Sequence, residues 1–143
     1  MSKEDQFIEA CKNNNIKKIK KLVYDGVNIH ESNDAGFKWA CCTGCIEIVI
    51  YLTTLHQITF TNGIKYNMID INSQSEYCFR WACYEGHIKI IYYLIKLHKK
   101  HKYYKPINIY DESYSGNCMM YSYPVKLIAN LGNYKKKLIK SII

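Results

Sequence analysis

Arginine is nearly absent from this sequence. Arg80 is the only arginine among 20 basic residues, so lysine supplies almost all of the positive charge behind the formal net charge of +8. A basic field attracts polyanions non-specifically, whereas the planar fork of arginine reads phosphates and guanines bidentately. The scarcity of arginine therefore argues against a specific nucleic-acid site. Non-specific binding to nucleic acid or to an anionic surface stays open as an alternative.

Long apolar runs are missing as well. Lys, Glu or Asn interrupts every apolar run well before the roughly 20 residues of a membrane-spanning helix, and the charged N-terminus lacks the apolar stretch of a secretory signal. We expect a protein with no membrane span, located inside the cell. In that setting we interpret the seven cysteines, an odd number, as small buried hydrophobes and not as a disulfide framework.

Motifs of catalysis are also lacking. The sequence has no phosphate-cradling glycine loop, no Gly-x-Ser-x-Gly and no His-Glu-x-x-His. His98 and His101 have no orienting carboxylate or nucleophile beside them, and we interpret them as part of a solvated polar loop. We therefore expect no enzyme activity and no cofactor.

What the sequence does contain is an internal repeat. The frame Phe-x-x-Ala-Cys-x-x-x-x-Ile occurs at 7–16, 37–46 and 79–88, and its alanines are 30 and 42 residues apart. A second apolar stretch at helical spacing follows each frame. The pattern predicts three units of helix, tight turn and helix, with connectors of variable length.

Glycine and asparagine mark the predicted turns, because both tolerate the left-handed conformation that ends a helix. These turns are Asn14-Asn15, Gly44-Cys45 and Gly86-His87. The repeat also bears on metal binding. Cys41 and Cys45 could supply two zinc ligands, but Cys41 shares its repeat position with Cys11 and Cys83. Burial explains these thiols better, and we expect no metal site.

The connectors share features too. Ile29 and Ile71 each lie 11 residues before the alanine of the next frame, in short stretches of alternating polarity that we interpret as extended. The stretches 53–68 and 96–105 exceed a normal connector. Both contain a Leu-His pair, at 55–56 and 97–98, which predicts that the second helix continues for about another turn before a long loop.

The chain resembles the ankyrin repeat family, most closely the variant ankyrin-repeat proteins of amoeba-infecting giant DNA viruses. The stretch Gly86-His-Ile-Lys-Ile-Ile-Tyr-Tyr-Leu-Ile95 is similar to the family's Gly-His-x-x-Val-Val-x-x-Leu-Leu, and Asp25-Gly-Val-Asn-Ile29 to its Gly-Ala-Asp-Val-Asn. Phe79-Arg-Trp-Ala-Cys83 resembles the viral variants. The family's Thr-Pro-Leu-His start of the first helix is absent, so its capping network is not expected.

The resemblance implies an all-α solenoid of about four helix-turn-helix units with short extended or hairpin connectors, in one domain. The units span approximately 5–32, 33–73, 74–112 and 113–143. The fourth is degenerate, as terminal repeats are, because one face meets water. From the repeat positions we also expect Trp39 and Trp81 to be buried between repeats and to stack across neighbouring units.

The resemblance further implies a non-catalytic protein-protein interaction module that binds its partner through the concave face of the stack. By position, the contact residues are Asn33, Asp34, Lys38, Ser75, Glu76, Arg80 and Tyr84. We expect a monomer in the host cytoplasm whose partner is a host protein. The run from His98 to Lys105 is the best candidate for the alternative, binding to nucleic acid or an anionic surface, because lysine supplies charge and tyrosine can stack on bases. A third interpretation is a decayed copy with no present role.

Overall fold

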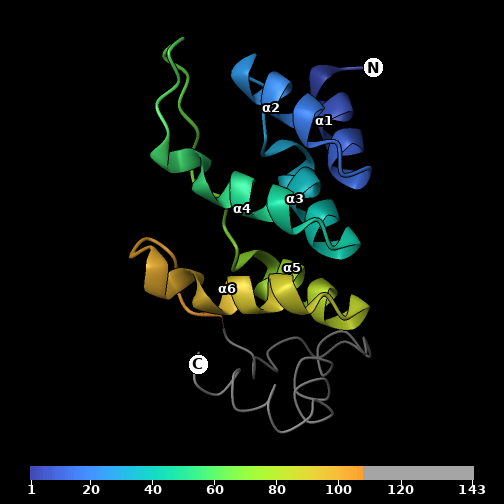
Figure 1. Cartoon of the computed structure of the whole chain (residues 1–143), viewed down its shortest axis with the longest axis vertical. Helices are drawn as coiled ribbons and strands as arrows, with labels where there is room; N and C mark the ends of the chain where they lie inside the picture. The colour runs from blue at the N-terminus through green and yellow to red at the C-terminus, as the bar shows by residue number, and fades with distance from the viewer. Residues whose placement is uncertain (108–143) are drawn as a thin grey trace, which may run out of the picture. The chain divides into compact units, whose positions relative to one another are not determined.

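Helices are the regular secondary structure of the part of this protein that the structure describes. The computed structural model describes residues 1–107, apart from the side chains of residues 74–76, and this part contains six α-helices, one 3-10 turn and no strand (Figure 1). The predicted all-α class is confirmed. The predicted fourth unit, 113–143, lies outside the described residues. The chain divides into two compact units, one ending at Asp70 and the other beginning at Ile71.

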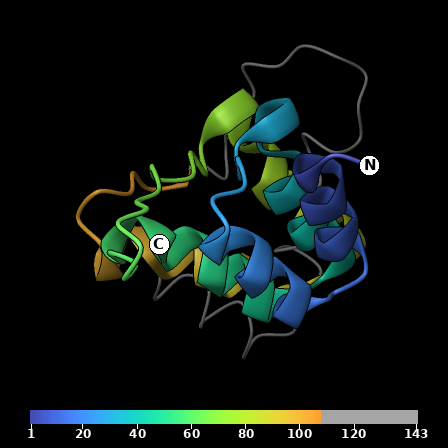
Figure 2. The same ribbon diagram turned by 90° about the horizontal axis from the view of Figure 1, so that it is seen from above.

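Two helical hairpins form the first unit. The first pairs α1 (Lys3–Lys12) with α2 (Ile16–Tyr24), and the second pairs α3 (Glu31–Thr43) with α4 (Ile46–Thr54). α1 packs against both α2 and α3, and α3 packs against α4. Seen from above, α1 and α3 form one layer of this unit and α2 and α4 form the other (Figure 2).

The second unit contains one described hairpin, in which α5 (Ser73–Glu85) packs against α6 (Ile88–Lys100). The side-chain amide of Asn72 donates to the carbonyl of Pro106 over 3.3 Å, which ties the start of α5 to the chain after α6. α6 is 13 residues long, and the 3-10 turn η1 (Leu55–Gln57) extends α4. The predicted continuation of the second helix is therefore confirmed in both hairpins.

The turn within each hairpin has the same geometry. Gly44 and Gly86 end α3 and α5 in the left-handed conformation, with φ of 82° and 75°. The next amide then reaches back to the alanine of the frame, from Cys45 to Ala40 over 3.0 Å and from His87 to Ala82 over 2.9 Å. Asn14 takes the left-handed conformation after α1, with φ of 55°. In these turns, backbone amides donate hydrogen bonds to carbonyls at the helix end that have no partner within the helix.

The repeated frame forms the core. Its phenylalanines, Phe7, Phe37 and Phe79, are fully buried, and its alanines are at most 4% exposed. The cysteines that follow the alanines are buried too, and burial raises the pKa of Cys11 and of Cys83 to about 12. Of the six described cysteines, all except Cys42 are buried. The interpretation of the frame cysteines as buried thiols is thus confirmed.

Gly36 allows α1 and α3 to approach closely. A Cβ placed on Gly36 would lie 2.5 Å from Cε1 of Phe7 and 3.1 Å from the sulfur of Cys11, inside van der Waals contact. Both neighbours belong to α1 and are fully buried. A side chain at this position would therefore push the two helices apart.

The long connector after α4 folds back onto the end of α2. Tyr66 donates its hydroxyl proton to the carbonyl of Val23, and the side-chain amide of Asn62 donates to the carbonyl of Tyr24 over 2.7 Å. The ring of Phe60 makes edge-to-face contacts with Tyr24 and Tyr66, at centroid distances of 6.2 and 6.1 Å. The connector is therefore fastened to the preceding hairpin by hydrogen bonds and ring packing.

Candidate functional site

The predicted contact residues of the first unit lie at the start of α3. Ser32, Asn33 and Asp34 have φ of 53°, 59° and 61°, so the chain makes a short left-handed turn before the regular helix. This conformation costs roughly 1–2 kcal/mol per residue for most side chains and less for Asn and Asp. Asn33 is exposed, while Asp34 and Lys38 are half-buried.

His30 holds this turn in place. Its Nδ1 lies 2.7 Å from Oδ1 of Asp34, and its Nε2 lies 3.2 Å from the carbonyl oxygen of Asn67. The imidazole therefore has an acceptor at each ring nitrogen and connects the turn to the long connector. Asp34 is consequently engaged within the protein, and of the three predicted residues Asn33 is the most available to a partner.

In the second unit the prediction is only partly useful. Tyr84 is 42% exposed, as expected for a contact residue. Arg80 is 1% exposed, so its placement on the surface was wrong. It lies one helical turn before Cys83, whose pKa its positive charge lowers against the larger effect of burial. The side chains of Ser75 and Glu76 are among those that the structure does not describe.

The tryptophans were expected in the core, and for Trp39 this is wrong, since it is 40% exposed. The ammonium group of Lys12 lies 4.5 Å from the centroid of the Trp39 ring, a cation-π contact between α1 and α3. Trp81, at the same frame position in α5, is half-buried. Both side chains are therefore presented at least in part to solvent.

α5 carries an aromatic row that sequence reasoning missed. Its buried residues, Cys78, Phe79, Arg80, Ala82 and Cys83, leave Tyr77, Trp81 and Tyr84 on the more exposed side. The ring of Trp81 makes edge-to-face contacts with Tyr77 and Tyr84, at centroid distances of 6.2 and 5.7 Å. The spacing i, i+4, i+7 is the signal that could have identified this row, because it places three rings on one helix face.

The basic run after α6 is only partly a solvated loop. His98 lies within α6, half-buried, with its Nδ1 2.9 Å from the carbonyl oxygen of Ile95. Tyr104 is 4% exposed, whereas Tyr103 is 61% exposed with the Lys102 ammonium group 5.2 Å from its ring. The lysines of the run are all exposed, at positions 99, 100, 102 and 105.

Cys42 and Cys45 form a Cys-x-x-Cys pair across the turn between α3 and α4, which the sequence interpretation passed over. Neither cysteine forms a disulfide, and Sγ of Cys45 lies 3.2 Å from Oγ1 of Thr43. That hydroxyl donates to the carbonyl of Trp39 over 2.8 Å. Among the described residues, no three His, Cys, Asp or Glu side chains gather closely enough to hold a metal ion.

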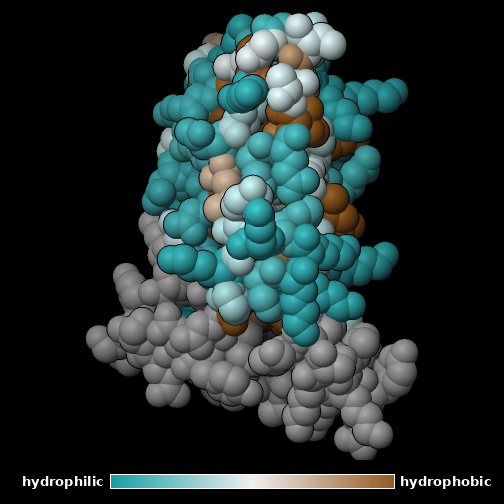
Figure 3. Space-filling model, turned by 90° about the vertical axis from the view of Figure 1, so that its left-hand side faces the viewer, coloured by the Kyte–Doolittle hydropathy of each residue, from teal (hydrophilic) through white to brown (hydrophobic). Residues whose placement is uncertain are grey.

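Figure 3 shows one face on which hydrophilic residues predominate and apolar residues emerge in small patches. In residues 1–107 no helix combines the length and the apolar character that crossing a bilayer requires.

Over residues 1–107 the fold and these surfaces define a class of protein: an all-helical structure built from helical hairpins of one design, with aromatic side chains exposed on α3 and α5. Neither a family model, nor a curated protein, nor a solved structure matches the chain.

Proposed function

We propose that this chain is an ankyrin-type repeat protein that binds another protein through the exposed side of the first helix of its hairpins, without catalysis. Three features support the ankyrin assignment: the thrice-repeated frame, the left-handed turn after its first helix, and the backbone bond from that turn to the frame alanine. From the resemblance we further propose a host protein as partner and the host cytoplasm as location.

The aromatic row of α5 is the observation that carries this proposal. Tryptophan and tyrosine dominate the energetics of protein interfaces, because each offers a large surface with few rotatable bonds. The rings of Tyr77, Trp81 and Tyr84 already support one another by edge-to-face contact, so little side-chain freedom is lost on binding. In α3, Trp39 is likewise held by Lys12.

A partner suited to these surfaces offers an apolar or aromatic anchor together with acceptors for nearby donors. On α3 the donors are the Lys12 ammonium group, which is half-exposed, and the side chain of Asn33. Arg80 is not included, because it is buried. The proposed contact residues are therefore Asn33, Trp39, Trp81 and Tyr84.

The test is a comparison of the proteins retained by two baits. Wild-type chain and a Trp39→Ala/Tyr84→Ala variant are immobilised, and the retained host proteins are quantified by mass spectrometry at about 150 mM salt, where surface charge is partly screened. We expect a partner that is lost with the variant and kept with a Lys65→Ala control, since Lys65 is exposed in the long connector. If both variants retain the same proteins as the wild type, the proposal fails.

A second candidate function rests on the basic run 98–105. Its exposed lysines and the 61% exposed ring of Tyr103 combine charge with a stacking surface, which suits a single-stranded polyanion. Binding of this kind weakens steeply with salt and is insensitive to Tyr84. A chain that retains nucleic acid and no protein at physiological salt would favour this function over the first.

A further inference from the structure

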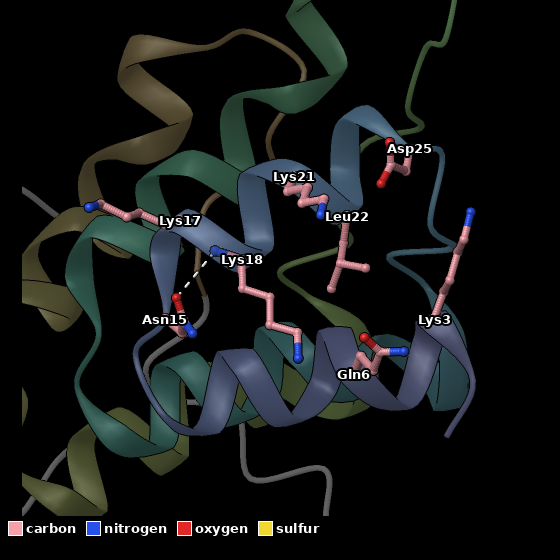
Figure 4. Close-up of a pocket in the computed structure, with 8 residues that line it drawn as sticks. All are labelled: Lys3, Gln6, Asn15, Lys17, Lys18, Lys21, Leu22 and Asp25. Carbon is pink, nitrogen blue, oxygen red and sulfur yellow. Dashed lines mark hydrogen bonds between the residues drawn. The ribbon is translucent and has the colours of Figure 1, made fainter.

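A groove lined by lysine lies between α1 and α2. Its volume is about 560 Å³. α1 contributes Lys3 and Gln6, and the remaining lining residues are Asn15, Lys17, Lys18, Lys21, Leu22 and Asp25. In Figure 4 Lys18 extends across the space toward α1, Leu22 points into it from α2, and the amide of Gln6 faces it from α1. The groove is contained within the first unit.

The positive charge of this groove is not balanced locally. Four lysines line it against the single carboxylate of Asp25. Among the described residues, none of these four ammonium groups forms an ion pair with a carboxylate. The surrounding unit has no such excess, because residues 1–70 hold eight basic and eight acidic residues.

The charges in the first turn of α2 are also the opposite of those that helix stability favours. Acidic residues stabilise the first turn of a helix, and α1, α3 and α4 each have one or two there. α2, like α6, has none, and α2 begins instead with Lys17 and Lys18. Lys17 and Lys18 are four and three residues from Lys21, at spacings where like charges repel. A bound anion would relieve this repulsion.

We propose that this groove binds a small, multiply charged anion of the organic polyphosphate class. Its volume lies in the range of small-molecule sites, and lysine binds phosphate as a point charge without demanding one orientation. Several ammonium groups around one hollow match several phosphates on a compact scaffold. The Asn15 side chain already accepts the amide proton of Lys18, so recognition depends on ammonium groups more than on the open end of α2.

A polymeric anion fits this groove less well. The whole net charge of +8 resides in residues 71–143, which hold twelve basic and four acidic residues, and residues 1–70 are neutral. Long-range attraction would draw nucleic acid or heparin to the second region. A compact ligand instead senses the lysines within a few ångströms of it, because screening limits the field to about 8 Å at physiological salt.

The test is titration calorimetry of the full chain with myo-inositol hexakisphosphate at about 150 mM salt. The Lys18→Gln/Lys21→Gln variant removes two lining charges, and the Lys20→Gln/Lys65→Gln variant removes two charges that do not line the groove. Lys20 is on the same helix, with its ammonium group 5.6 Å from the ring of Tyr51. We expect about tenfold weaker binding for the first variant and less than about twofold for the second, since charge-assisted bonds are lost only in the first.

Equal weakening by the two variants would overturn the proposal, because the ligand would then respond to overall charge. So would backbone amide shifts on ligand addition that cluster at residues 96–105 and spare residues 3–25. Vesicles containing phosphatidylinositol bisphosphate provide a second arm. If the chain binds these vesicles and the binding depends on Lys18 and Lys21, the phosphates belong to a lipid headgroup. If the chain binds the free inositol phosphate and not the vesicles, they belong to a soluble ligand. Partner capture by α3 and α5 is independent of both arms.

Discussion

The two regions of this protein share a hairpin design and differ in charge. α3–α4 in the first unit and α5–α6 in the second have the same frame, the same left-handed glycine and the same backbone bond to the frame alanine. Yet residues 1–70 are neutral, and residues 71–143 carry the full +8. The comparison teaches that the buried frame determines the hairpin, while the exposed positions are free to differ and determine what each region attracts.

The largest expected effect tests whether the frame is equally essential in both units. Ala40→Asp and Ala82→Asp each place a carboxylate at a position that is 0% exposed. Burying an unpaired charge costs several kcal/mol, which is comparable to the stability of a small domain. We expect loss of cooperative unfolding and of helical circular dichroism in both variants. Lys89→Asp, at an exposed position of α6, is the control. A folded Ala82→Asp chain would show that the second hairpin does not depend on its frame.

The next effect distinguishes the two units. Gly36 corresponds to Cys78 in the repeat, so the second hairpin already has a side chain where the first has none. Gly36→Ala should lower the free energy of unfolding by about 1–3 kcal/mol, since its Cβ would overlap the ring of Phe7. Chemical denaturation measures this. Cys78→Ala should cost less, and a larger loss for Cys78→Ala would contradict the close approach of α1 and α3.

A third prediction separates the regions by charge. Replacing Lys99, Lys100 and Lys102 by Gln should lower the salt dependence of heparin binding, reducing the slope of log affinity against log salt by about 2–3, because each phosphate contact releases counterions. The same number of changes at Lys17, Lys20 and Lys65 should reduce the slope by less. Affinity measured between low and physiological salt gives both slopes. Equal slopes would mean that the neutral unit binds polymers as well as the basic one.

The smallest effect concerns the left-handed turn before α3. Asn33 has φ of 59°, a conformation that alanine adopts less readily than asparagine or glycine. Asn33→Ala should therefore destabilise the chain by about 1 kcal/mol, and Asn33→Gly should be nearly neutral. Thermal unfolding of the pair makes the measurement. If Asn33→Gly lowers the stability more than Asn33→Ala does, the side chain of Asn33, and not its backbone conformation, contributes to stability.

The helices and turns could be predicted because their signals are local. Phe, Ala and Cys recur at one spacing, and a glycine or asparagine follows where a left-handed residue must end the helix. The same periodicity misplaced Arg80 and Trp39. A repeat frame predicts where a residue lies around a helix, but not how deeply its side chain is buried. Burial depends on contacts with elements that are far away in the sequence.

The remaining features depend on contacts between distant residues. His30 reaches Asn67, and Tyr66 reaches Val23, across about half of the first unit. Residue spacing does not predict such contacts, so the sequence indicated only a long loop at 58–68. The lysine groove was missed for the same reason. Lys3 and Lys18 are 15 residues apart, and only the packing of α1 on α2 brings them to one hollow.

Each unit contains a buried frame thiol whose alkylation can report the opening of that unit. Cys11 and Cys83 are at most 1% exposed, and burial keeps both protonated well above neutral pH by raising the pKa of each to about 12. Only the thiolate reacts with an alkylating reagent. Each cysteine therefore reacts only after its hairpin opens. The alkylation rates of these two residues, followed by mass spectrometry, therefore report the opening of one unit independently of the other.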